Sequence, residues 1–169
     1  MSTRSILAAG LVALAVVVAG CGSSGGGGGG GVYGGSSSSA NATAPSPGSG
    51  PSVKLASTKL GNVLADAQGR TLYLFEADKG PMSACDGACA SVWPPLMTTG
   101  KPTAGRGVTA SKLGTTKRSD GATEVTYNGH PLYTYAGDSA PGQTSGQGLD
   151  DYGAEWYALS ATGNKIDNG

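Results

Sequence analysis

Apolar and polar side chains alternate at residues 71–75 of this 169-residue chain. Leu72 and Leu74 alternate with Thr71, Tyr73 and Phe75, which is the period of two that a pleated strand requires. A similar run occupies residues 132–135, after a shorter β-prone run at residues 125–127. Asn128-Gly129 separates these two runs and predicts a hairpin, because both residues tolerate the positive φ of a type I′ turn.

Other short β-prone runs are separated by turn-forming residues, and helical periodicity is nearly absent. Only residues 83–92 are compatible with a short helix or helical turn. The pattern therefore predicts an all-β domain of hairpins and meanders. Its expected strands cover residues 62–66, 70–76, 115–118, 123–127, 156–160 and 165–166.

The chain contains an internal duplication. Residues 69–78 align with residues 129–138, and both segments contain Leu-Tyr-x-aromatic-x-x-Asp after an opening glycine. Upstream, residues 58–61 are echoed by residues 111–114, and each copy reaches one tryptophan downstream. We interpret the duplication as two copies of one supersecondary unit, related by approximate two-fold symmetry. Repeat 1 is expected over about residues 53–100 and repeat 2 over about residues 108–166.

An N-terminal apolar run at residues 6–19 follows Arg4 and ends at Val18-Ala19-Gly20-Cys21. The run is shorter than the roughly 20 residues of a membrane span, but it suits the apolar region of a secretory signal. The tetrapeptide resembles the bacterial lipobox, whose cysteine is acylated before the upstream segment is removed. We therefore expect residues 1–20 to be a lipoprotein signal peptide and Cys21 to carry the lipid, palmitate among its chains.

Residues 22–50 consist almost entirely of Gly, Ser, Ala and Pro. Such a segment offers too little apolar surface to offset the entropy of ordering it. We expect residues 21–51 to form a disordered linker and residues 52–169 to form the folded domain. The protein is then extracytoplasmic and anchored to the bacterial cell membrane by lipid.

The charge of the chain is balanced, with 11 Lys and Arg against 11 Asp and Glu. This balance argues against a nucleic-acid partner, because such proteins present a basic face to the phosphates. The expected partners are the membrane, which the lipid anchor contacts, and an envelope protein or a small ligand. No cofactor is expected.

Cys85 and Cys89 are the pair that remains once Cys21 is acylated. In an oxidising compartment an even pair indicates a disulfide, worth only about 2 kcal/mol because the closed loop is short. The alternative is a soft Cu(I) site that adds the thioether of Met82 or Met97. Zinc is not expected, since no four-ligand set is available.

Several motifs together carry a family resemblance: the duplicated Tyr-x-aromatic-x-x-Asp, the Cys85–Cys89 segment, and Trp93-Pro94-Pro95-Leu96. The chain resembles the bacterial secreted-repeat lipoproteins named for their Yx(F/W/Y)xxD motif. The second copy departs from the first in lacking the cysteine pair and the Pro-Pro. That family has no established biochemical activity, so the resemblance implies an envelope lipoprotein but no mechanism.

The motif residues are interpreted as structural. In a strand, Tyr73 shares a face with Phe75, so the two are expected to stack, and Tyr133 likewise with Tyr135. Each aspartate lies beyond a strand end, where its carboxylate can accept backbone N–H groups of a turn. The alternative is that the aromatic faces line a groove for a ligand such as a glycan or a quinone. The complete set is Tyr73, Phe75, Asp78, Trp93, Tyr133, Tyr135, Asp138 and Trp156.

The remaining polar residues do not indicate catalysis. His130 adjoins the predicted turn and is expected to be solvated, and no Gly-x-Ser-x-Gly elbow offers it a nucleophile. Asp150, Asp151 and Glu155 are expected in a solvated acidic loop that lacks the spacing of a Ca²⁺ site. The sequence therefore predicts a non-enzymatic binding or envelope-interaction module, with no catalytic or metal-ligating residue. The alternative is a redox or Cu(I)-handling lipoprotein that uses Cys85, Cys89 and the nearby methionines.

Overall fold

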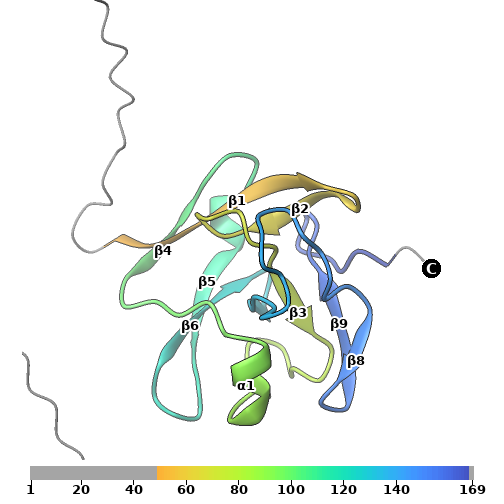
Figure 1. Ribbon diagram of the computed structural model, residues 1–169. Coiled ribbons are helices and arrows are strands. Elements are labelled where there is room, and N and C mark those ends of the chain that lie inside the picture. Colours follow the sequence, from red (N-terminus) through yellow and green to blue (C-terminus); the bar gives the residue numbers. More distant parts are fainter. Residues whose placement is uncertain (1–48, 168–169) are drawn as a thin grey trace, which may run out of the picture. The chain divides into compact units, whose positions relative to one another are not determined.

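The computed structural model describes residues 49–167 and consists mainly of short strands (Figure 1). The predicted all-β class is confirmed, since helix is confined to two short segments of this part of the chain. The elements are β1 (Ser49–Thr58), β2 (Gly61–Ala65), β3 (Tyr73–Phe75), α1 (Ala88–Val92), β4 (Lys101–Ala104), the 3₁₀ helix η1 (Ala110–Lys112), β5 (Leu113–Lys117), β6 (Thr123–Tyr127), β7 (His130–Pro131), β8 (Leu149–Asp151) and β9 (Ala154–Ala158). Among these residues there is no helix with the length and apolar character that a membrane crossing requires.

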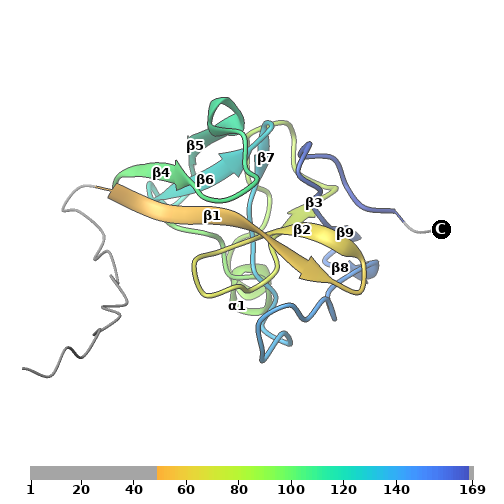
Figure 2. The same cartoon turned by 90° about the horizontal axis from the view of Figure 1, so that it is seen from above.

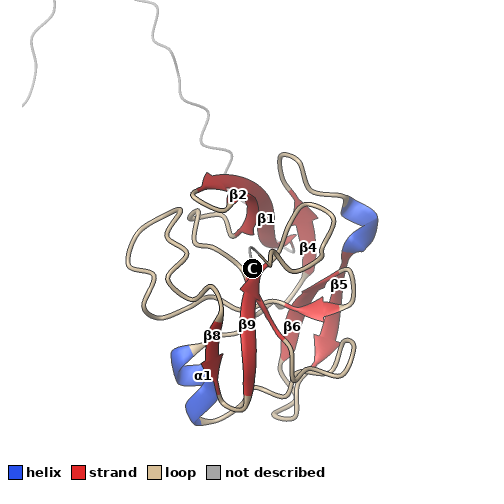
Figure 3. Cartoon of the chain, turned by 90° about the vertical axis from the view of Figure 1, so that its right-hand side faces the viewer, coloured by secondary structure: helices blue, strands red, loops and turns tan. Residues whose placement is uncertain are grey.

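The strands form three small sheets, ordered β2-β1-β4, β3-β9-β8 and β5-β6-β7. Strand β1 pairs in parallel with β4 through its first half and antiparallel with β2 through its second half, as Figure 2 shows from above. The other strand pairs are antiparallel. In Figure 3, α1 lies next to β8 and η1 lies near β4 and β5.

The hairpin at Asn128-Gly129 forms as predicted. Both residues have positive φ, 52° for Asn128 and 85° for Gly129, and β6 pairs with β7 around them. The pairing Thr126↔Pro131 brings Leu132 and the second motif segment back along β6.

In each repeat, the strand that carries the motif pairs with the tryptophan-containing segment of the other repeat. Strand β3 of repeat 1 pairs with β9 of repeat 2, with Phe75 opposite Trp156. In the reverse direction, Thr134 N–H of repeat 2 donates to the Pro94 carbonyl of repeat 1 over 2.9 Å. Each aromatic strand is therefore completed by the tryptophan segment of the other copy.

The motif tyrosines lie where the two copies meet. The Tyr73 N–H donates to the Tyr133 carbonyl over 2.8 Å, and the Tyr133 N–H donates to the Tyr73 carbonyl over 3.0 Å. Equivalent residues of the two copies thus bond to each other, as residues beside a local two-fold axis do.

Residues 71–75 are buried on both faces of their strand. Leu72 and Leu74 belong to one core cluster, whereas Tyr73 and Phe75 belong to a second. Strand β9 divides in the same way, with Tyr157 in the first cluster and Trp156 in the second. The alternating pattern therefore sorts side chains between two cores, not between a core and solvent.

Several elements differ from the expectations. The first strand begins at Ser49, three residues before the expected start of the domain, and β1 and β4 were not predicted because few of their residues are apolar. The expected helix shortens to α1, and the segment expected as an acidic loop instead forms the β8–β9 hairpin around Tyr152 and Gly153, both with positive φ.

The upstream echo does not mark equivalent positions. Residues 58–61 form the turn between β1 and β2, whereas residues 111–114 run from η1 into β5. The corresponding parts of the two copies are the β1–β2 and β5–β6 hairpins, each of which precedes a motif segment.

Candidate functional site

The tyrosines and aspartates of the duplicated motif bond to each other across the two repeats. The Tyr73 hydroxyl of repeat 1 donates to Asp138 Oδ2 of repeat 2 over 2.6 Å. The Tyr133 hydroxyl of repeat 2 lies 3.0 Å from Asp78 Oδ2 of repeat 1 and donates to it. The motif thus forms two reciprocal Tyr–Asp pairs.

Each aspartate also organises the loop that follows its strand. Asp78 Oδ1 accepts the Ala84 N–H over 2.7 Å, and Asp138 Oδ1 accepts the Ser145 N–H over 2.8 Å. The expected role of these carboxylates at turns is therefore present, but the bond to the phenol of the other copy was not anticipated from sequence.

Four aromatic rings form a continuous stack in the second core cluster. Trp93 and Trp156 stack at its centre, 4.0 Å apart and 4° from parallel. Phe75 lies on the outer face of Trp156 at 4.1 Å, and Tyr135 lies on Trp93 at 4.5 Å. Both outer rings therefore cover the tryptophan of the other repeat.

The expected stacking of each tyrosine on the aromatic two residues later is not found. Tyr73 instead meets Trp93 edge-on at 5.4 Å, and Tyr133 meets Trp156 edge-on at 5.1 Å. Side chains at positions i and i+2 share a face but are held apart by the strand rise, so a tryptophan from a later segment of the chain lies closer.

The expected disulfide between Cys85 and Cys89 forms, with the sulfur atoms 1.94 Å apart. Both cysteines are buried in the cluster that contains the aromatic stack. The alternative Cu(I) site required two thiolates, and the disulfide consumes both. The disulfide therefore contradicts Cu(I) binding by this cysteine pair.

A buried ion pair next to the disulfide was missed by sequence reasoning. Arg118 Nη1 donates to Glu124 Oε2 over 2.8 Å, and both side chains are at least nine-tenths buried. The same guanidinium donates to the Cys85 carbonyl and to Ser83 Oγ. Ser83 Oγ lies 2.7 Å from the Tyr133 hydroxyl, so the ion pair connects with one Tyr–Asp pair.

The carboxylates of this network are poorly solvated. Burial raises the pKa of Asp78 to about 6, although the Ala84 N–H and the Tyr133 hydroxyl both favour the charged form. Burial raises the pKa of Glu124 to about 7, against the opposing effect of Arg118. Burial also raises the pKa of Tyr73 and of Tyr133, so both phenols keep their protons at neutral pH.

The raised pKa of Asp78 predicts a pH-dependent contribution to stability. Because the folded pKa of about 6 exceeds the ordinary value of 3.8, the folded state binds a proton more tightly than the unfolded state. This stabilisation is complete below the ordinary pKa and is lost as pH rises through about 6. Asp78→Asn should flatten the pH profile of the unfolding free energy, measured by denaturant titration from pH about 4 to about 7. Identical profiles for the variant and the wild type would refute the assignment.

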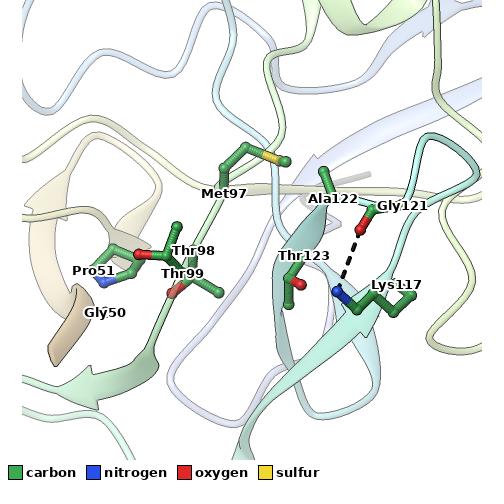
Figure 4. A pocket seen from close by; sticks show the side chains of 9 residues that line it. All are labelled: Gly50, Pro51, Met97, Thr98, Thr99, Lys117, Gly121, Ala122 and Thr123. Carbon is green, nitrogen blue, oxygen red and sulfur yellow. Dashed lines mark hydrogen bonds between the residues drawn. The ribbon is translucent and has the colours of Figure 1, made fainter. Parts of the chain in front are cut away.

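A groove lies between the β5–β6 hairpin and residues 97–102 (Figure 4). We call it the threonine groove. It consists of two adjoining hollows of about 620 and 420 Å³ that share Thr98, Thr99 and Thr123. Its full lining is Gly50, Pro51, Met97, Thr98, Thr99, Gly100, Lys101, Pro102, Leu113, Gly114, Thr115, Lys117, Gly121, Ala122 and Thr123.

The backbone holds the two sides of the threonine groove together. The Thr98 N–H donates to the Thr123 carbonyl over 2.9 Å, so residues 96–98 run along β6. In Figure 4 the Lys117 ammonium points toward the Gly121 carbonyl, 3.3 Å away. The lining contains two lysines and no carboxylate, and the hydroxyls of Thr99 and Thr123 have no partner among residues 49–167. The groove therefore suits a ligand that accepts hydrogen bonds and is neutral or anionic.

A second hollow, of about 550 Å³, lies over Phe75. Asp78, His130, Glu76 and Lys165 contribute to its lining, but Lys165 Nζ is already paired with Glu76 Oε1 at 2.7 Å. His130 is half-buried, not solvated as expected, and burial lowers its pKa. Since its charged groups largely satisfy each other, this hollow is the weaker candidate for a ligand.

The predicted lipidation site, Cys21, lies outside the described residues, as do the predicted signal peptide and most of the predicted linker. They remain predictions from sequence.

The comparisons with known proteins agree with the duplication. A family model described as a secreted repeat of unknown function matches the chain twice, over residues 54–97 and residues 114–160. No curated protein and no solved structure matches the chain. The two matched segments correspond to the two copies that exchange strands in the structure.

Proposed function

We propose that this chain, which belongs to the family of secreted repeats, is a lipid-anchored protein whose repeat domain serves as a binding module outside the cytoplasm. The family is secreted and has no assigned activity. The lipid anchor and the binding role are our additions to that description.

The observation that carries the proposal is that the residues of the duplicated motif contact one another. The motif tyrosines, aspartates and tryptophans contact each other in the interior, where they join the two copies. In this proposal the motif residues stabilise the fold, and residues on the surface of the domain bind the partner. The threonine groove supports this role, because it is open and has hydroxyls and an ammonium group, that of Lys101, without partners among the described residues.

The anchor is supported by Val18-Ala19-Gly20-Cys21 at the end of the apolar N-terminal run. Two or more acyl chains give stable membrane attachment, whereas one chain gives only reversible binding. The chain between Cys21 and Ser49 would separate the domain from the membrane surface.

The anchor is tested with Cys21→Ser. The variant should incorporate no labelled fatty acid, and it should either leave the membrane fraction or retain its signal peptide. Metabolic labelling, membrane fractionation and intact mass measure these outcomes. A serine variant with unchanged mass and normal membrane retention would contradict the anchor.

The binding role is tested with the Cys21→Ser chain as bait in envelope extracts. Lys101→Glu combined with Lys117→Glu reverses the charge of the threonine groove. Lys59→Glu combined with Lys79→Glu makes the same change at two exposed sites outside it. Binding through the groove predicts that the first variant loses a captured component that the second retains. Equal capture by both variants would exclude the groove as the binding face.

A further inference from the structure

The readily oxidised side chains of the second core cluster form one connected group. Trp93 and Trp156, whose indoles are the easiest aromatic rings to oxidise, stack 4.0 Å apart. Tyr73 meets the edge of Trp93 at 5.4 Å, and Tyr133 meets the edge of Trp156 at 5.1 Å. At such ring-to-ring distances an electron passes readily between neighbours.

Each of these two tyrosines also has a base for its phenolic proton. A phenol that loses an electron becomes strongly acidic, so its oxidation is easiest where a base already accepts its hydrogen bond. Asp138 Oδ2 lies 2.6 Å from the Tyr73 hydroxyl, and Asp78 Oδ2 lies 3.0 Å from the Tyr133 hydroxyl. Both distances are in the range for direct proton transfer.

Another buried tyrosine of the domain lacks this arrangement. The hydroxyl of Tyr127 donates to the Ala161 carbonyl over 2.8 Å, and a backbone carbonyl is too weak a base to take the proton. Tyr127 also belongs to the other core cluster, away from the two tryptophans. It therefore provides an internal control.

From this geometry we infer that the Trp93–Trp156 stack and its two Tyr–Asp pairs form a relay that takes up one-electron oxidation and stores it as a tyrosyl radical. A one-electron oxidant such as an organic peroxyl radical takes one electron from the stack and becomes a peroxide anion, leaving an indole radical cation. Tyr73 then gives one electron to that radical cation and its phenolic proton to Asp138. The products are a neutral tryptophan, a neutral Tyr73 radical and a protonated Asp138; Tyr133 and Asp78 react in the same way.

The ends of the stack suggest where the electron leaves. Phe75 covers Trp156, and its phenyl ring is hard to oxidise. Tyr135 covers Trp93 at 4.5 Å and is only half-buried, so it offers an oxidisable ring at the surface. An external one-electron reductant such as a hydroquinone anion restores the relay by returning one electron to the tyrosyl radical, while the aspartate returns the proton; the hydroquinone anion becomes a semiquinone radical.

The relay is tested on the full chain with photogenerated tris-bipyridine ruthenium(III) as the one-electron oxidant. Transient absorption follows the tryptophan radical, and freeze-quench electron paramagnetic resonance identifies the tyrosyl radical. In the wild type the tryptophan radical should decay as the tyrosyl signal rises, more slowly in deuterated water. Tyr73→Phe combined with Tyr133→Phe should lengthen the life of the tryptophan radical by on the order of tenfold or more.

The proton acceptor is tested separately. In a Tyr133→Phe background, Asp138→Asn should slow the formation of the Tyr73 radical, because an amide cannot take the proton. Tyr127→Phe should leave every signal unchanged, and near-ultraviolet circular dichroism checks that each variant is folded. An unchanged lifetime of the tryptophan radical in the doubly substituted variant would overturn the relay. The absence of a solvent isotope effect on the wild-type protein would also overturn the relay, and this measurement requires no substitution.

Discussion

A chain that ends at Gly107 is expected to remain unfolded. Such a chain keeps repeat 1 but loses β9, the partner of β3, and with it Trp156 at the centre of the aromatic stack. Loss of one buried tryptophan side chain alone costs about 3–5 kcal/mol, and a small domain has only about 5–15 kcal/mol in total. Circular dichroism and a denaturant titration would show no cooperative transition.

The complementary fragment, residues 108–169, provides the control. It should also be unfolded alone, and mixing the two fragments should restore a cooperative transition because each supplies the strand that the other lacks. Cooperative unfolding of either fragment alone would show that a repeat is self-sufficient and would contradict the exchange of strands.

Phe75→Ala is expected to destabilise the domain by about 3–5 kcal/mol. Phe75 is 3% exposed and lies on Trp156 at 4.1 Å, with the two rings 9° from parallel. It has no hydroxyl, so its truncation reports lost packing without a lost hydrogen bond. A chemical denaturation curve measures the change.

Two further variants calibrate that result. Phe75→Leu keeps most of the volume and should cost less than Phe75→Ala. Tyr135→Ala alters the matching end of the stack, but it should also cost less because Tyr135 is only half-buried. A loss below about 1 kcal/mol for Phe75→Ala would favour the alternative in which the aromatic faces line a ligand groove.

The local parts of the fold could be predicted from the sequence. Asn128-Gly129 specifies its hairpin through backbone conformations that few other residue pairs adopt, and the alternation at residues 71–75 predicts a strand. The duplicated motif predicts two equivalent copies. What the pattern did not indicate is which copy completes which strand, because β3 and β9 are far apart in sequence.

The position of the motif residues could have pointed to the exchange. Tyr73 lies in the strand whereas Asp78 follows the turn at its end, so the two side chains of one copy are not placed to bond to each other. A buried phenol and a buried carboxylate each need a partner. The second copy is the part of the sequence that offers the same two groups at the same spacing.

The buried ion pair could not have been found in this way. Arg118 directly follows β5 and precedes a polar turn, a position at which charged residues are normally solvated. Glu124 follows the same turn. The alternation of side chains along residues 123–127 does not show which face of this strand points into the core. Arg118 is buried by its contacts with the Cys85 carbonyl and Ser83, and a local sequence pattern cannot show contacts between residues so far apart along the chain.

The most direct test of the exchanged motif is a double-mutant cycle on Tyr73→Phe and Asp138→Ala. The Tyr73 hydroxyl donates to Asp138 over 2.6 Å, and a buried hydrogen bond to a charged group contributes about 1.5–3 kcal/mol. The unfolding free energies should therefore show a coupling of that size between Tyr73 and Asp138. A parallel cycle on Tyr73→Phe and Asp78→Ala should be additive to within about 0.5 kcal/mol. Coupling of Tyr73 to Asp78, with none to Asp138, would show that each repeat satisfies its own motif and would contradict the account.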